Sequence, residues 1–315
     1  MTKKVIAGSL ALLAVTAMYA QTYQLPNVGF KNWEKAKGIL WTEKNKNQGQ
    51  PGEEPQSWHS SNIKFATGWA GSYQELVQKK SGNGKTYANV INKKSGQASS
   101  YIPTLGTLTI GNTWYANYGA TGGYRATNEK FAQNGTYGGL SFVGRPDAIV
   151  GDFQNYSSDS HIIAYLWKGS FNGKVPATFD DGATGPFYNK KYNPTIKSWL
   201  KLENLDRAIW SQIDPSIVTS ETVQNITKSD DAAIIAYVDK AYTANSSDWT
   251  TNVINLNYLS DAAPEMTNVI IAAGYPWDSR KSVKEESINV DNVRYAYFSR
   301  LSDASIDGYA FDFNP

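Results

Sequence analysis

Residues 288–298 read Ile288-Asn289-Val290-Asp291-Asn292-Val293-Arg294-Tyr295-Ala296-Tyr297-Phe298, and this stretch indicates the fold class most clearly. β-Branched and aromatic residues dominate it, which favours a β-strand. Strict alternation gives two sets of side chains, namely Ile288, Val290, Asn292, Arg294 and Ala296 on one face and Asn289, Asp291, Val293, Tyr295 and Tyr297 on the other. Because neither face is purely polar, we expect a strand inside a sandwich, with one face partly covered by loops.

Similar short stretches recur along the chain after Gln21. They cover residues 39–42, 86–92, 101–110, 148–156, 162–167, 232–237, 253–258 and 269–273. Turn signals such as Asn134-Gly135 separate them. Many short strands with long loops predict an all-β sandwich. Residues 194–213 differ, because Asn193-Pro194 is typical of a helix start and apolar residues follow at helical spacing, which predicts one short helical insertion.

Composition excludes several classes of protein. The chain has 315 residues, of which 41% are hydrophobic, 13% aromatic and only 18% charged, with a net charge of +2. Aromatic residues at this level and a low net charge predict a folded chain, since disordered chains have the opposite composition. The absence of a basic stripe argues against nucleic acid as a partner. The chain has no cysteine, so disulfides, lipid attachment through a thiol and thiolate chemistry are excluded.

The N-terminus has the pattern of a secretory signal peptide. Lys3 and Lys4 precede an apolar run over residues 5–17, and the small residue Ala20 precedes Gln21. The run is shorter than the roughly 20 apolar residues of a membrane-spanning helix. We therefore expect residues 1–20 to be removed, an exported protein in the periplasm or on the outer cell surface, and no transmembrane segment after cleavage.

Aromatic residues in loops are the best sequence candidates for a binding site. Residues 113–124 are rich in glycine and aromatic rings, and other tryptophans lie in polar or glycine-containing contexts. Sugars stack their C–H faces on such rings, while nearby polar groups bind their hydroxyls. The predicted ligand-binding residues are Trp58, His59, Trp69, Trp114, Tyr118, Tyr124 and Trp277. Three further tryptophans, Trp33, Trp167 and Trp249, are predicted to lie in the core.

Catalytic residues are less clearly indicated. The two histidines, His59 and His161, are too few for a histidine-based metal centre. Glycoside hydrolysis needs a pair of carboxylates, and the candidates are Asp147, Asp152, Asp180, Asp181, Glu203, Asp206, Asp278, Glu285 and Glu286. No spacing in the sequence pairs any two of them, so the catalytic residues stay unassigned. No cofactor is expected to be required. A structural calcium ion is a hypothesis, with Glu34 and Asp291 as its oxygen ligands.

Several spaced segments together resemble a known family. They are 25–34, with Leu-Pro-Asn-Val-Gly-Phe-Lys-Asn-Trp-Glu; 58–62; 144–156, which begins Gly-Arg-Pro-Asp; Trp249 through Tyr258; and 288–295. The order and spacing of these segments resemble the "putative carbohydrate metabolism domain" of exported Bacteroidetes proteins, over roughly residues 23–297. The sequence departs from the family at Phe153-Gln154-Asn155-Tyr156, where the family has a Tyr-Lys-Tyr-like element, so no role passes to a lysine there.

The resemblance implies a jelly-roll sandwich of the galactose-binding type over residues 21–298. Residues 299–315 would then be a C-terminal tail, which reads as the start of a truncated second module. The resemblance supplies no catalytic residues.

Three hypotheses for the function follow. The first is non-catalytic binding of an oligo- or polysaccharide in polysaccharide use, which we favour. The others are a glycoside hydrolase or lyase that uses a carboxylate pair, and a structural or adhesive surface protein. Enzymatic activity is thus the less favoured reading.

Overall fold

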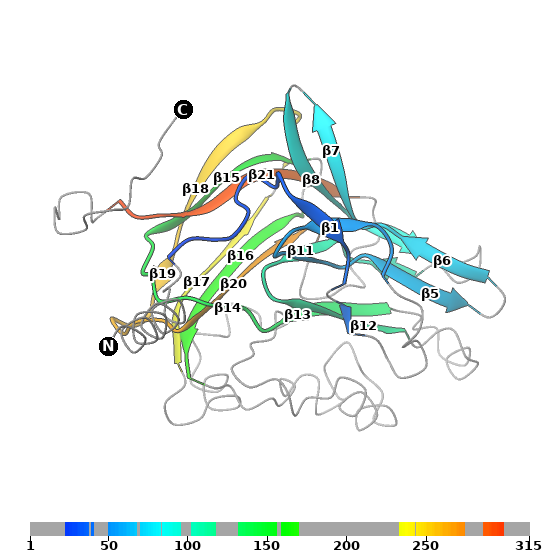
Figure 1. Ribbon diagram of the computed structural model, residues 1–315. Helices are drawn as coiled ribbons and strands as arrows, with labels where there is room; N and C mark the ends of the chain where they lie inside the picture. The colour runs from blue at the N-terminus through cyan, green and yellow to red at the C-terminus, as the bar shows by residue number, and fades with distance from the viewer. Residues whose placement is uncertain are drawn as a thin grey trace, which may run out of the picture.

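The structure is a computed structural model, and it describes residues 23–37, 39–40, 50–67, 70–82, 84–95, 102–117, 132–155, 159–169, 233–242, 244–274 and 286–298. Two large sheets dominate it (Figure 1). The seven-stranded sheet runs in the order β19 (Asn257–Tyr258), β17 (Ala233–Ala241), β16 (His161–Lys168), β20 (Met266–Ala272), β11 (Thr107–Thr109) and β4 (His59–Ser60), with β14 (Leu140–Ser141) also on β20. The five-stranded sheet runs in the order β18 (Thr250–Asn255), β15 (Ala148–Asn155), β21 (Ser287–Ala296), β8 (Lys85–Ile91) and β7 (Val77–Gly82).

Four smaller sheets complete the described part of the chain. They are β1 (Trp33–Lys35) with β3 (Glu53–Pro55), β5 (Ile63–Thr67) with β6 (Ala70–Gln74), β9 (Lys93–Ser95) with β10 (Ile102–Thr104), and β12 (Asn112–Asn117) between β2 (Ile39–Leu40) and β13 (Ala132–Tyr137). Among the described pairings, the parallel one joins β12 to β2 and the others are antiparallel.

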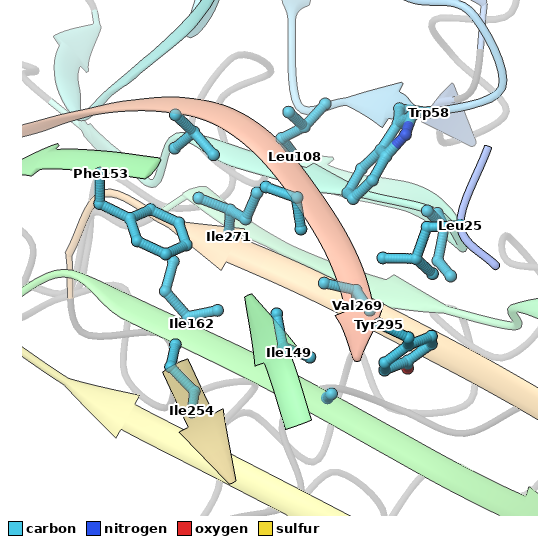
Figure 2. Packing of buried hydrophobic residues seen from close by; sticks show 14 of the residues in the cluster. Leu25, Trp58, Leu108, Ile149, Phe153, Ile162, Ile254, Val269, Ile271 and Tyr295 are labelled. Atoms are coloured by element: carbon cyan, nitrogen blue, oxygen red, sulfur yellow. The ribbon is translucent and has the colours of Figure 1, made fainter. Parts of the chain in front are cut away.

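The hydrophobic core lies between the two large sheets. Residues from both sheets form one buried cluster, as Figure 2 shows for Ile149, Phe153, Ile254 and Tyr295 against Leu108, Ile162, Val269 and Ile271. The inward side chains alternate along β15 and β16, as a pleated strand with one core face requires. The predicted sandwich of β-sheets is therefore confirmed, and each predicted strand segment contains a strand.

The alternation predicted for residues 288–298 is wrong beyond Asp291. The core contains Ile288 and Val290 but then Val293, Tyr295 and Tyr297, so the inward face changes parity at Asn292. Asn292 has a φ of 54°, and the register between β15 and β21 shifts at this point. An irregularity of this kind adds a residue to one strand and bends it. The bulge turns the Asn292 side chain to the outside of the sandwich, where it donates to Asp152.

The prediction of a single strand over residues 101–110 also needs correction. The structure divides this segment into β10 and β11, which belong to different sheets. The break lies at Gly106, where a Cβ atom would approach the carbonyl oxygen of Ile91 to 2.3 Å. Only glycine allows the two backbones to come this close.

The central strand β16 of the seven-stranded sheet is buried on both faces. On β16, Ile162, Ala164 and Leu166 belong to the core cluster, and Ile163, Tyr165 and Trp167 on the opposite face are buried as well. On the five-stranded sheet, the face away from the core contains exposed residues.

Some predictions concern residues outside the described ranges. The helical insertion at 194–213, the signal peptide at 1–20 and the tail at 299–315 all lie there. The regular elements within the described ranges are strands. No helix long and apolar enough to cross a membrane occurs in these ranges.

Candidate functional site

The candidate site is the outer face of the five-stranded sheet, defined here by the outward side chains of β18, β15, β21, β8 and β7. These are Thr251, Val253, Val150, Asp152, Gln154, Asn289, Asp291, Asn292, Arg294, Lys85, Tyr87, Asn89, Gln78 and Lys80. They alternate with the core residues of the same strands, so the sheet itself places them together. The outer face is thus largely polar.

Two aromatic rings meet across this face. Tyr87 projects from β8, and Trp249 directly precedes Thr250 at the start of β18. Their ring centroids are 5.2 Å apart at an interplanar angle of 77°, an edge-to-face contact. Because β15 and β21 lie between β8 and β18 in the sheet, the two rings must reach toward each other above the central strands. Both residues are half-buried, so part of their surface stays in contact with solvent.

Lys85 joins the aromatic pair to a carboxylate. Its Nζ atom is 5.9 Å from the centroid of the Trp249 ring and 3.5 Å from Oδ2 of Asp152. The first contact is a cation–π arrangement. The second is a long ion pair, and the Lys85 side chain remains 48% exposed. The ammonium group therefore lies over the Trp249 ring and beside Asp152, and its side chain is partly open to solvent.

The sheet brings two carboxylates together below these groups. Asp152 on β15 lies directly opposite Asp291 on β21. Asp152 accepts hydrogen bonds from Thr251 Oγ1 at 2.6 Å and from Asn292 Nδ2 at 2.7 Å. Although burial alone would raise its pKa, these two hydrogen bonds and the charge of Lys85 together lower the pKa of Asp152.

Asp291 has the opposite shift. Burial raises the pKa of Asp291, and the negative charge of Asp152 adds to this effect. The backbone amide of Asn292 donates to Asp291 Oδ1 at 2.8 Å, and Lys85 and Lys31 also oppose the shift without cancelling it. The pKa values of these two neighbouring carboxyl groups are thus shifted in opposite directions. In such a pair, one group takes up a proton more readily and the other stays ionised more readily.

A row of amide side chains lies beside the carboxylates. Asn89 Nδ2 donates to Asn289 Oδ1 at 2.7 Å, and Asn289 Nδ2 donates to Gln154 Oε1 at 2.8 Å. Gln154 in turn donates to the carbonyl of Ser247, just before Trp249. The row crosses β8, β21 and β15 and links the sheet to the segment that holds Trp249. It thereby anchors the backbone two residues before Trp249 to the sheet.

We predict that the two carboxylates affect stability in opposite directions. The lowered pKa of Asp152 means that its contribution to stability is present above its usual value of 3.8 and is lost as pH falls through its folded-state pKa. The raised pKa of Asp291 means that its contribution is full below 3.8 and is lost as pH rises through its folded-state pKa. At pH 7, Asp152→Asn should therefore lower the free energy of unfolding by about 1–3 kcal/mol, since it disrupts charge-assisted hydrogen bonds.

At the same pH, Asp291→Asn should leave the free energy of unfolding unchanged or raise it by up to about 1 kcal/mol, because it removes a buried charge. Urea unfolding of both variants and the parent at pH 4 and pH 7 measures these effects. A loss of stability for Asp291→Asn at pH 7 as large as that for Asp152→Asn would contradict this assignment.

The site residues that were predicted from the sequence do not gather on the outer face. Trp58 is 0% exposed and belongs to the core cluster, where its Nε1 donates to the carbonyl of Pro26 at 2.9 Å. Its ring meets Phe30 edge to face at 5.3 Å. A ring enclosed in this way cannot stack on a ligand, so Trp58 is a structural residue.

His59 and Glu34 lie on the small strands beside the core. Nδ1 of His59 is 3.0 Å from Oε1 of the buried Glu54, whose Oε2 accepts hydrogen bonds from the Ser60 backbone and hydroxyl. Glu34 forms an ion pair of 2.6 Å with Lys37, and that hydrogen bond lowers its pKa, helped by the nearby charge of His59. These contacts join β1, β3 and β4, and the structure gives Glu34 no contact with Asp291.

The described residues offer no ready metal centre. They contain no group of three His, Cys, Asp or Glu side chains arranged to hold an ion. Trp69, Tyr118, Tyr124 and Trp277 fall outside the described ranges, and for Trp114 the structure describes only its backbone place on β12.

Sequence reasoning missed Tyr87 and Lys85 and assigned Trp249 wrongly to the core. Trp167 is fully buried, although on the face of β16 opposite the core cluster, and Trp33 packs against the core cluster. The sequence did contain a signal for the outward direction of Lys85 and Tyr87. Residues 85, 87 and 89 alternate with the apolar residues Ala88 and Val90 along the predicted strand and the residue before it. The position of Trp249 one residue before a strand edge gave no comparable signal.

Two residues of the family-like segments have a structural role. The Arg145 guanidinium lies 4.3 Å from the ring centroid of Tyr258 and donates to the carbonyls of Ser260 and Ala262. The Tyr258 hydroxyl donates to the carbonyl of Pro146 at 2.7 Å. These contacts hold the loop before β15 against the loop after β19, away from the aromatic pair.

Comparison with known proteins gives distant structural likenesses. No protein-family model and no curated protein matches the chain. A "putative glycoside hydrolase" from Bacteroides thetaiotaomicron is similar at 12% identity and a TM-score of 0.38, over 71% of this chain and 57% of that one. A "putative glycoside hydrolase" from Bacteroides vulgatus is similar at 11% identity and a TM-score of 0.42, over 87% of this chain and 97% of that one. A carbohydrate-binding module of the β-sandwich superfamily is similar at 9% identity and a TM-score of 0.28, over 82% and 61% of the two chains.

Proposed function

We propose that this protein binds a carbohydrate on the outer face of the five-stranded sheet, without cleaving it. The observation that supports the proposal is the half-buried pair Tyr87–Trp249, held 5.2 Å apart above a polar sheet surface. Aromatic rings that remain partly exposed while fixed in position are suited to ligands with apolar faces.

The surrounding groups fit a sugar better than a purely apolar ligand. A pyranose ring has a C–H face that packs on an aromatic ring and hydroxyl groups around its edge. Beside the two rings the outer face supplies a carboxylate on Asp152, an ammonium on Lys85 and a hydroxyl on Thr251. These groups can donate to or accept from hydroxyls at the sugar edge, which would set the orientation of the ligand.

A glycoside hydrolase is the second candidate, favoured by the Asp152–Asp291 pair. The raised pKa of Asp291 suits a general acid, and the lowered pKa of Asp152 suits a nucleophile or base. Binding ranks first because Asp152 and Asp291 are cross-strand neighbours on one face of the sheet. Hydrolysis requires the two carboxyl groups to flank the scissile bond, whereas binding requires only the rings and the polar groups beside them.

The test is a glycan array probed with the purified chain, with calcium present, followed by an assay for new reducing ends on every glycan that binds. The proposal predicts binding without release of reducing ends. Release that Asp152→Asn abolishes would replace the binding proposal with the hydrolase. No binding across a broad array would instead favour the structural or adhesive alternative.

We also propose four further features of this protein. They are cleavage after residue 20, export to the periplasm or outer surface, a galactose-binding-like jelly-roll topology for residues 21–298, and a structural calcium ion. The calcium expectation is tested by thermal unfolding with calcium and with a chelator, which should give a higher Tm with calcium.

A further inference from the structure

We propose that the carbohydrate is anionic, with a carboxylate or sulfate group that Lys85 binds beside the Tyr87–Trp249 pair. This inference rests on the proposed carbohydrate binding and adds the chemical class of the ligand. The observations behind it are the position of Lys85, the partners of Asp152 and the second lysine beside Tyr87.

Lys85 is placed where a bound sugar would present its substituents. The Nζ atom lies 5.9 Å from the centroid of Trp249 and its side chain is 48% exposed. A sugar packed on the exposed part of these rings would bring its exocyclic groups close to this ammonium. The cation thus faces the ligand rather than the sheet interior.

The charge of Lys85 is paired with Asp152, yet the Lys85 side chain stays 48% exposed. Its distance of 3.5 Å to Asp152 Oδ2 is longer than the roughly 2.7–2.9 Å of a charge-assisted hydrogen bond. Asp152 has shorter bonds to Thr251 and Asn292, at 2.6 and 2.7 Å. A ligand oxyanion can therefore approach Lys85 without displacing the partners that keep Asp152 in place.

A second lysine extends the positive charge along the outer face. Lys80 on β7 lies directly opposite Tyr87 in the ladder and is exposed. The carboxyl groups of Asp152 and Asp291 act against an anion on this face, so the proposal depends on the charge of Lys85. Tyr87 therefore has Lys80 as its cross-strand neighbour and Lys85 two residues before it on β8, which suits a sugar with an oxyanion substituent.

The experiment compares charged polysaccharides with neutral counterparts of the same backbone. The probes are polygalacturonate, alginate and hyaluronan, each with its carboxyl-reduced form, together with dextran sulfate and dextran, titrated calorimetrically against the full chain. We expect a charged form to bind and its neutral counterpart to bind at least tenfold more weakly. Preference for a uronate identifies a carboxylate as the recognised group, and preference for dextran sulfate that Trp249→Ala abolishes identifies a sulfate.

Two matched variants test the role of Lys85. Lys85→Met should weaken binding of the charged form about fivefold and leave the neutral form unchanged. Lys79→Met is the control, because Lys79 makes the same 5.9 Å contact with a tryptophan, Trp33, on the opposite face of the hairpin. It changes the net charge equally and should have no effect.

The outcomes distinguish a failure of the anionic ligand class from a failure of carbohydrate binding. Equal binding of charged and neutral forms overturns the anionic class while carbohydrate binding stands. Equal losses for Lys85→Met and Lys79→Met, or binding of dextran sulfate that Trp249→Ala does not affect, mean general charge attraction and also overturn it. Binding of none of these probes, together with a silent glycan array, overturns both the inference and the proposed function.

Discussion

Replacing Trp249 with alanine should weaken binding of the glycan about 30-fold. Aromatic residues at the centre of an interface typically contribute about 2 kcal/mol or more, which corresponds to this factor. Trp249 contacts Tyr87 and Lys85 simultaneously, so its removal takes away one stacking surface and loosens two other groups. Because the ring is half-buried and outside the core cluster, the free energy of unfolding should change by less than about 1 kcal/mol.

The measurement is calorimetric titration with the glycan found on the array, with urea unfolding of the same samples. Leu259→Ala is the control, because Leu259 is also a partly exposed hydrophobic residue, at 38%, and lies after β19, outside the outer face. Its affinity should equal that of the parent. Undiminished affinity in Trp249→Ala would remove the outer face as the binding site.

The sheet architecture was predictable from the sequence because the hydrophobic pattern of a strand reports on its burial. Residues 162–167 are a continuous apolar run, typical of a strand buried on both faces, and residues 288–290 alternate, typical of a strand with one core face. The bulge at Asn292 was not predictable, since it depends on a positive φ and on pairing with β15, more than 130 residues away in the sequence. The same long-range pairing places Asp152 opposite Asp291, so local sequence could not identify the carboxylate pair.

The tryptophans show why the site was only partly predictable. The polar neighbours of Trp58, from Ser57 to Asn62, suggested an exposed ring. Most of these neighbours are themselves buried, and they bond to Glu54 and to backbone groups of other strands. Polar residues that satisfy each other inside a protein look the same in a sequence as polar residues in water. Trp249 shows the opposite error, because it was predicted to be in the core and lies outside it. It directly precedes β18, where its burial depends on partners far along the chain.

Replacing Trp58 with alanine should lower the free energy of unfolding by about 3–5 kcal/mol, the usual loss for a large aromatic residue in a core. The ring is completely buried and packs on Phe30, and its Nε1 bonds to the carbonyl of Pro26. Removal leaves a cavity where the N-terminal segment meets the two sheets, and it also leaves that carbonyl without its donor. Both losses act on the folded state.

Urea unfolding measures this effect, and Trp249→Ala is the control for the identical substitution on the outer face. Trp58→Phe should lower the free energy of unfolding less than Trp58→Ala does. The phenylalanine ring keeps part of the packing contact, although the hydrogen bond to Pro26 is lost. The pair of alanine variants should therefore separate the two properties, with Trp58 affecting stability and Trp249 affecting binding. If Trp58→Ala unfolded at the same urea concentration as the parent and instead lost glycan affinity, the core position of Trp58 would be refuted, and the binding surface would have to be relocated to the N-terminal side of the sandwich.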